Sequence, residues 1–208
     1  SKVAPYTLPD PLLCEDGTRV MDAQTWQAKR RGEILHSFST QMYGRTPELP
    51  FKVSAEVTAT RTNAVDGLAT RTLVTLRFFD DPAAPRINLM LYVPNNAAAK
   101  PAPVFLGLNY WGNACVEADP AIPITDQWMR PSPEMGIVNN RATEATRGCH
   151  VSRWPLALAL RRGYAVATFF YGDIEDDNEN GWRTGLRGYL MRKEGRTEAT
   201  PEEWGALG

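Results

Sequence analysis

Tyr164-Ala165-Val166-Ala167-Thr168-Phe169-Phe170 is the apolar run that decides the fold of this chain, because it follows a helical pattern and reads as a strand. That helical pattern starts at Pro155 and stops at Gly163, in keeping with the preference for proline at the start of a helix and glycine just past its end. Another compact apolar run, residues 104–108, lies further upstream and has the character of a strand covered on both faces. A strand, a helix and a strand in this order predict a right-handed unit with two parallel strands.

Three strand-like runs precede this unit, over residues 51–60, 68–79 and 86–93. Short turn-forming segments separate them, and strands joined in this way pair antiparallel because a parallel crossover needs a dozen or more residues. The sequence therefore predicts an α/β fold in which an antiparallel meander leads into a parallel βαβ unit. This order resembles the N-terminal part of an α/β-hydrolase, a three-layer αβα sandwich, and we expect further strands beside the one that ends at Phe170.

A helical pattern also stands before the meander. Asp22 can cap this helix, and Gly44 with Pro47 can end it. Apolar residues recur on one face of the pattern, which predicts packing against a sheet; they are Trp26, Ile34, Leu35, Phe38 and Met42. A second helix is predicted to begin at residues 202–204, with Thr200 as its cap and Pro201 at its first position.

The composition limits the classes of partner. The chain has 208 residues, of which 43% are hydrophobic, enough for a sizeable core in one domain or in part of a larger one. Its 23 basic and 24 acidic residues nearly cancel, so no basic field exists to hold nucleic acid or an anionic membrane surface. No apolar run approaches the roughly 20 residues of a membrane span. Small-molecule or polysaccharide chemistry is the expectation that remains.

Two loops carry the candidate site, because ligands in open α/β sheets sit beyond the carboxyl ends of the strands. Tyr110, Trp111 and Asn113 follow the first parallel strand and offer aromatic faces and an amide, the groups used to hold a sugar ring. Asp173 follows the second parallel strand. These four residues are the predicted substrate-binding set. The alternative is structural, with the aromatic rings covering the end of the sheet and Asp173 fixing its turn.

The groups of a catalytic centre are missing from the sequence. No Gly-x-Ser-x-Gly nucleophile turn occurs, and Ser152 lacks the flanking glycines that such a turn needs. His36 and His150 are far apart and fit no metal-ligand pattern. The acidic residues between 173 and 179 lack the spacing of a calcium loop. We therefore predict no catalytic residue and no metal site in this stretch of sequence.

Several ordered blocks of the chain together resemble the bacterial glucuronoyl esterases of carbohydrate esterase family fifteen. The likeness runs from about Tyr6 to the last residue. Its blocks are residues 107–113, 119–122, 147–148, 152–155, 162–168, 171–174 and 203–205.

The resemblance implies hydrolysis of the ester that joins 4-O-methyl-glucuronic acid of glucuronoxylan to lignin alcohols, without a cofactor, by a secreted or periplasmic protein. In that family a serine in a Gly-x-Ser-Arg-x-Gly turn attacks the carbonyl, a histidine moves the proton, an acidic residue orients the histidine, and the arginine helps to hold the oxyanion. All of these motifs would lie beyond residue 208. We therefore expect residues 1–208 to be the N-terminal portion of one catalytic domain, inactive until its C-terminal half completes it, in the same chain or as a second one.

Two other functions stay open at this point. One is another xylan esterase, of the acetyl type. The other is a noncatalytic carbohydrate-binding protein in which Tyr110 and Trp111 serve as stacking platforms.

Three cysteines fit neither a zinc pattern nor a dense disulfide framework: Cys14, Cys115 and Cys149. They allow one disulfide with one free thiol, or three buried thiols. Because the loop of Cys149 resembles an insertion at the edge of the family's pocket, a disulfide between Cys115 and Cys149 is one expectation, and two separate thiols are the other.

Overall fold

The computed structural model describes residues 3–46, 52–96, 101–200 and 202–205. The chain forms two compact units, Ser1–Leu49 with Glu198–Gly208, and Pro50–Thr197. The larger unit contains the sheet and the candidate site.

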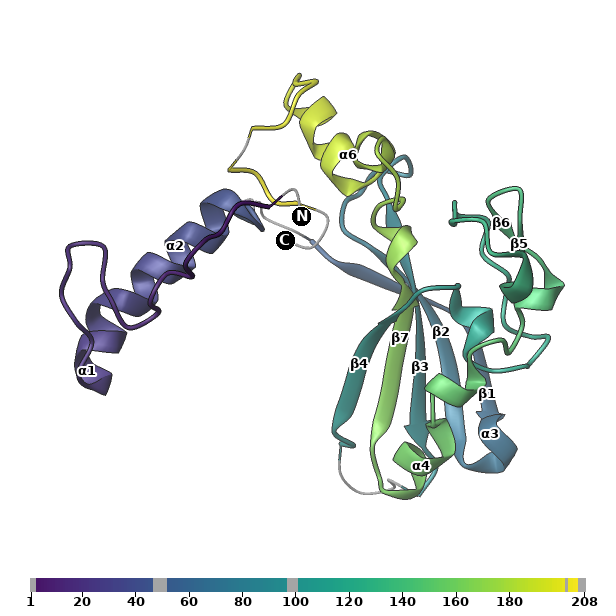
Figure 1. The fold of residues 1–208 in the computed structure, drawn as a ribbon. Helices are drawn as coiled ribbons and strands as arrows, with labels where there is room; N and C mark the ends of the chain where they lie inside the picture. Colours follow the sequence, from purple (N-terminus) through teal and green to yellow (C-terminus); the bar gives the residue numbers. More distant parts are fainter. Residues whose placement is uncertain (1–2, 47–51, 97–100, 201, 206–208) are drawn as a thin grey trace. The chain divides into compact units, whose positions relative to one another are not determined.

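The sheet begins with the predicted meander (Figure 1). Its strands are β1 (Ser54–Asn63), β2 (Ala69–Arg77) and β3 (Arg86–Pro94). β1 pairs antiparallel with β2, and β2 pairs antiparallel with β3. The turn-forming segments after residues 60 and 79 therefore act as the sequence predicts; residue 51, the predicted start of the first strand, lies outside the described residues.

The parallel unit follows as predicted. β4 (Val104–Asn109) leads through a long loop to α4 (Leu156–Arg161) and then to β7 (Ala165–Phe170). β4 and β7 are parallel, with Val104 opposite Ala165 and Asn109 opposite Phe170. The strand order in the sheet is β1-β2-β3-β7-β4. An antiparallel meander that leads into a parallel βαβ unit is thus confirmed.

β7 lies inside the sheet and β4 lies at its edge, which corrects two expectations. The crossover returns the chain towards the meander, so that β7 pairs with β3 on one side and with β4 on the other. The strand that ends at Phe170 therefore already has neighbours on both sides. β4 is not covered on both faces, because Phe105 is 60% exposed and Leu106 is 64% exposed.

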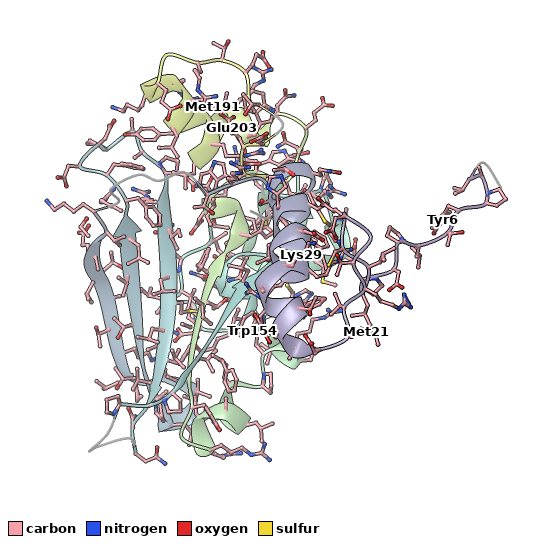
Figure 2. The ribbon with its side chains drawn as sticks, turned by 90° about the vertical axis from the view of Figure 1, so that its left-hand side faces the viewer. Tyr6, Met21, Lys29, Trp154, Met191 and Glu203 are labelled. Carbon is pink, nitrogen blue, oxygen red and sulfur yellow. The ribbon has the colours of Figure 1, made fainter. Side chains whose placement is uncertain are left out.

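The smaller unit contains the predicted first helix. It runs through α1 (Ala23–Thr25), a π-helical turn (Trp26–Arg30) and α2 (Arg31–Gln41), and Figure 2 shows Lys29 on it. Asp22 caps the helix, since its Oδ1 accepts a hydrogen bond from the N–H of Thr25 at 2.7 Å. The predicted apolar face is not buried in the described residues, where Leu35 and Phe38 are both exposed. Pro47 and Pro201 lie outside the described residues.

The predicted helix at residues 202–204 is wrong. Glu203 forms a parallel β-bridge with Arg45, and the N–H of Gly205 donates to the carbonyl of Tyr43 at 2.7 Å. These backbone groups are thus engaged with another segment instead of with a helical turn. The close approach requires Gly44, whose φ is 74° and where a Cβ would lie 1.9 Å from the carbonyl oxygen of Glu203.

Other elements lack a strong sequence signal. β5 (Ile137–Val138) and β6 (Arg141–Ala142) form a hairpin inside the long loop. Its turn uses Asn139 and Asn140 at φ 50° and 61°, a left-handed conformation that asparagine tolerates. After β7 come α5 (Gly181–Thr184) and α6 (Leu186–Lys193), which carries Met191 (Figure 2). Among the described residues, no helix combines the length and apolarity of a membrane span.

The main core lies on the face of the sheet that α4 covers. It joins β2, β3 and β7 to α4 and to the segment that follows β4. Its buried residues include Leu73, Met90, Tyr92, Cys115, Val116, Ile122, Leu156, Leu160 and Val166. This packing fixes the loop after β4 against the sheet.

Candidate functional site

The loop after β4 is fixed by two asparagines. Asn109 is buried, and its Nδ2 donates to Asn113 Oδ1 at 2.8 Å and to Thr168 Oγ1 at 3.1 Å. Asn113 Nδ2 in turn donates to the carbonyl of Asn88 on β3 at 2.6 Å. Gly112 makes the turn between them, since its φ is 80° and a Cβ there would lie 2.7 Å from Cγ2 of Thr125.

The loop after β7 is fixed to the same residue of β3. Asp173 ends a short 3-10 helix (Tyr171–Asp173) and is only 5% exposed. Its Oδ2 accepts a hydrogen bond from the N–H of Asn88 at 2.7 Å. Burial raises the pKa of Asp173 to about 6, although the Asn88 N–H and the charge of Arg86 both favour the ionised form. The backbone of Asn88 therefore holds both loops, one through its N–H and one through its carbonyl.

A cavity of about 370 Å³ opens beside these contacts. Asn113, Asp173 and Asn88 line it together with Arg86 and the segment 122–126. A cavity of this size with a few convergent polar groups is typical of a small-ligand site. The structure thus brings two of the four predicted substrate-binding residues to one cavity.

Tyr110 and Trp111 lie outside the lining of this cavity and differ from each other. Tyr110 is 66% exposed, and its ring meets that of Tyr171 edge-on at 5.5 Å between centroids. Trp111 is half-buried and packs against the core, and its Nε1 donates to Nε2 of His150 at 3.1 Å. Tyr110 therefore presents its ring to solvent at the carboxyl ends of the parallel strands, whereas Trp111 joins the loop to His150 and to the core.

One buried acceptor at this edge has no partner among the described residues. It is Oδ1 of Asn109, while the Nδ2 of the same side chain is fully engaged. Asn109 is the last residue of the edge strand β4. The polar network that begins at Asn88 and Asp173 thus ends at the open edge of the sheet.

A buried ionic cluster joins residues 117–119, which follow the loop after β4, to strand β2. Arg71 on β2 is 3% exposed, and its Nη1 contacts Glu117 Oε2 at 2.9 Å and Asp119 Oδ2 at 2.8 Å. Tyr92 donates its hydroxyl to Glu117 at 2.6 Å. Burial opposes ionisation of Asp119, but the N–H of Ala121 and the guanidinium of Arg71 outweigh it and lower the pKa of Asp119. The sequence pattern did not reveal this cluster, because Glu117 and Asp119 lie 46 and 48 residues after Arg71 in the chain.

Among the hydrogen bonds of the described residues, none joins His150 to Ser152. His150 accepts the hydrogen bond of Trp111, and burial, helped by the charge of Arg153, lowers its pKa. Ser152 is exposed and lies in a 3-10 helix (Val151–Arg153).

The acidic stretch after β7 is paired with basic and phenolic side chains. Glu175 binds Arg187 through two hydrogen bonds, and Asp177 contacts Arg130 at 3.5 Å and the hydroxyl of Tyr171 at 3.3 Å. In the described part of the chain, no group of three or more His, Cys, Asp or Glu side chains could hold a metal ion.

The three cysteines are free thiols in the structure. Backbone hydrogen bonds bring the segments of Cys115 and Cys149 together, and each thiol influences the pKa of the other. Cys14 lies in the smaller unit.

Comparison with known proteins places the whole chain beside carbohydrate esterases. The chain is 37% identical over 209 residues to carbohydrate esterase MZ0003 from an unknown prokaryotic organism, which it covers to 47%. A solved glucuronoyl esterase from Solibacter usitatus is 43% identical with a TM-score of 0.84, over 99% of this chain and 50% of that one. A promiscuous CE15 esterase from a marine bacterial metagenome is 36% identical with a TM-score of 0.79, again over 99% and 50%.

These relatives are about twice as long as the chain, which spans about half of their length. No protein-family model matches the sequence. The names of the relatives do not favour an acetyl-type esterase or a noncatalytic binding protein.

Proposed function

Because this chain is homologous along its whole length to the CE15 glucuronoyl esterases, we propose that it forms part of a serine-type esterase of that kind. The substrate is the ester between 4-O-methyl-glucuronic acid of glucuronoxylan and lignin alcohols. The observation that carries the proposal is the junction at Asn88, where the loops after β4 and β7 meet beside a cavity of about 370 Å³.

The proposed role of this chain is to bind the sugar. Asn113 and Asp173 offer hydrogen-bonding groups inside the cavity. Tyr110 offers an exposed ring, and aromatic rings stack well on the apolar face of a sugar. Trp111, the next residue, joins the same loop to His150. Binding energy of this kind holds the ester in place for attack by groups that this stretch of sequence does not contain.

The second half of the domain is proposed to dock on β4. β4 is an edge strand with exposed apolar side chains, among them Val104 at 54%, Phe105 at 60% and Leu106 at 64%. An edge strand of this kind pairs readily with another strand. The docked half, in the same chain or a second one, would supply the nucleophilic serine, the histidine, the acidic residue and the donors that hold the oxyanion, which provide most of the rate enhancement in acyl transfer.

The location follows from the substrate. Glucuronoxylan and lignin are polymers outside the cell, so a secreted or periplasmic protein is proposed.

A substrate panel tests the proposed function. The complete protein, containing these 208 residues and its second half, is assayed on the benzyl ester of 4-O-methyl-glucuronic acid and on acetylated xylan. We expect turnover of the glucuronate ester and little release of acetate. Residues 1–208 alone should hydrolyse neither. A preference for acetylated xylan, or binding of xylan without hydrolysis of either ester, would exclude the proposal.

A further inference from the structure

Cys115 and Cys149 are held together by the backbone on both sides of Cys149. The N–H of Gly148 donates to the carbonyl of Ala114 at 2.8 Å, and the N–H of His150 donates to the carbonyl of Cys115 at 3.0 Å. These two bonds fix the segment of Cys149 along the segment of Cys115. The two thiols are close enough for each to influence the pKa of the other.

Close approach of the two segments depends on Gly148. Its φ is 69°, and a Cβ there would lie 2.8 Å from the Cβ of Ala118. The glycine therefore permits a conformation and a spacing that other residues would oppose. Gly148 thus allows the segment of Cys149 to lie close to Ala118, three residues after Cys115.

The two thiols differ in access. Cys115 is fully buried, with no exposed surface, whereas Cys149 is partly exposed. Burial raises the pKa of Cys115 to about 12 and also raises the pKa of Cys149. An external reagent reaches Cys149 first, and Cys115 is placed to react only with a sulfur already attached to Cys149.

We propose that Cys149 and Cys115 form a thiol–disulfide exchange site whose substrate is a low-molecular-weight disulfide such as oxidised glutathione. The Cys149 thiolate attacks one sulfur of the disulfide, forming a mixed disulfide and releasing one glutathione thiolate. Cys115 then loses its proton and attacks Sγ of Cys149, displacing the second glutathione thiolate. Two protein thiols become one disulfide, and the oxidised glutathione becomes two reduced molecules, so that electrons and protons balance.

The bond would join the two loops next to the candidate site. His150 follows Cys149 directly and accepts the hydrogen bond of Trp111, so a disulfide would fix the support of the loop after β4. The proposal does not depend on the esterase function, because it concerns only these two segments.

The test counts thiols in the purified native protein before and after incubation with oxidised glutathione. Within these 208 residues the count should fall from three to one, and peptide mapping without reduction should show Cys115 joined to Cys149. The rate should rise about tenfold per pH unit below the pKa of Cys149, because only the thiolate attacks.

Serine variants separate the two steps. Cys115→Ser should stop the reaction at a mixed disulfide with glutathione on Cys149. Cys149→Ser should leave Cys115 unmodified, and Cys14→Ser, the matched control, should leave the exchange rate unchanged. A stable glutathione adduct on Cys149 of the wild-type protein, or three unreacted thiols, would overturn the proposal.

Discussion

The carboxylate of Asp173 accepts a hydrogen bond from the backbone N–H of Asn88 at 2.7 Å, which ties the loop after β7 to the first residues of β3. The carbonyl of the same residue receives the side chain of Asn113 from the loop after β4. One residue of a strand that is distant in sequence thus positions both loops of the candidate site.

Asp173 should make the stability of the protein pH-dependent. Its pKa in the folded state is about 6, above the ordinary value of 3.8, so the folded state holds the proton more tightly than the unfolded state. Stability should therefore fall as the pH rises from about 4 to 6, by about 2–3 kcal/mol for a shift of this size.

Urea unfolding of the purified protein at several pH values measures this effect. Asp173→Asn should remove most of the decline, whereas Asp80→Asn, which changes an exposed carboxylate paired with Lys52, should leave it in place. An identical pH profile in wild type and Asp173→Asn would contradict the prediction.

The buried cluster of Arg71 should contribute strongly to stability. Arg71→Met leaves Glu117 without its cation and leaves Asp119 with Arg61 alone, and removal of one partner of a buried pair costs about 3–5 kcal/mol. Arg77→Met is the matched control, because Arg77 lies on the same strand and contacts Glu56 at 3.8 Å on the surface, where such pairs contribute about 0–1 kcal/mol. Denaturant midpoints would compare the two variants, and similar losses would argue against the cluster's role.

The edge of β4 should be an interface in the complete protein. Leu106→Lys places a charge on an apolar side chain that is 64% exposed in this chain and would become buried when a second half docks. We expect a loss of about 2 kcal/mol or more in the complete protein and little change in the isolated chain. Val138→Lys, at a position that is 48% exposed on β5, is the control. Equal melting temperatures of Leu106→Lys and wild type in the complete protein would place the interface elsewhere.

The hydrogen bond of Trp111 should matter more for stability than for sugar contact. Trp111→Phe keeps an aromatic ring in the core but removes the Nε1–H that His150 accepts. The expected loss is about 1 kcal/mol in unfolding free energy, with a smaller change in kcat/KM than for Tyr110→Ala. Thermal unfolding and ester kinetics on the same preparation would check both parts.

Sequence patterns predicted the elements that local chemistry determines. Turn residues delimited β2 and β3, and the Pro155 to Gly163 pattern located α4 between two apolar runs. The failures concern non-local pairing. An apolar run such as β4 has the same pattern at an edge as in the middle of a sheet. Residues 202–204 have a helix-start signal that pairing with Arg45 overrides.

The candidate site was predictable only in part. Asn113 and Asp173 stand at strand ends, where topology brings polar residues together, and the structure places both on one cavity. The sequence did not indicate Asn88, because this residue holds the two loops through its backbone N–H and carbonyl, which every residue type except proline has. The sequence did not indicate the buried role of Arg71 either, since a basic residue within a strand is usually expected to be exposed.

We propose that the loops after β4 and β7 form the sugar-binding wall of a glucuronoyl esterase. The kcat/KM of Tyr110→Ala in the complete protein, on the benzyl ester of 4-O-methyl-glucuronic acid, tests this proposal. Tyr110 is 66% exposed, so its removal should leave the melting temperature unchanged. We expect a fall in kcat/KM of about tenfold or more, equivalent to about 1.4 kcal/mol of transition-state binding. Tyr6→Ala, at a tyrosine that is 75% exposed in the smaller unit, should retain wild-type activity. Full activity in Tyr110→Ala at unchanged stability would contradict the assignment of this loop to the substrate.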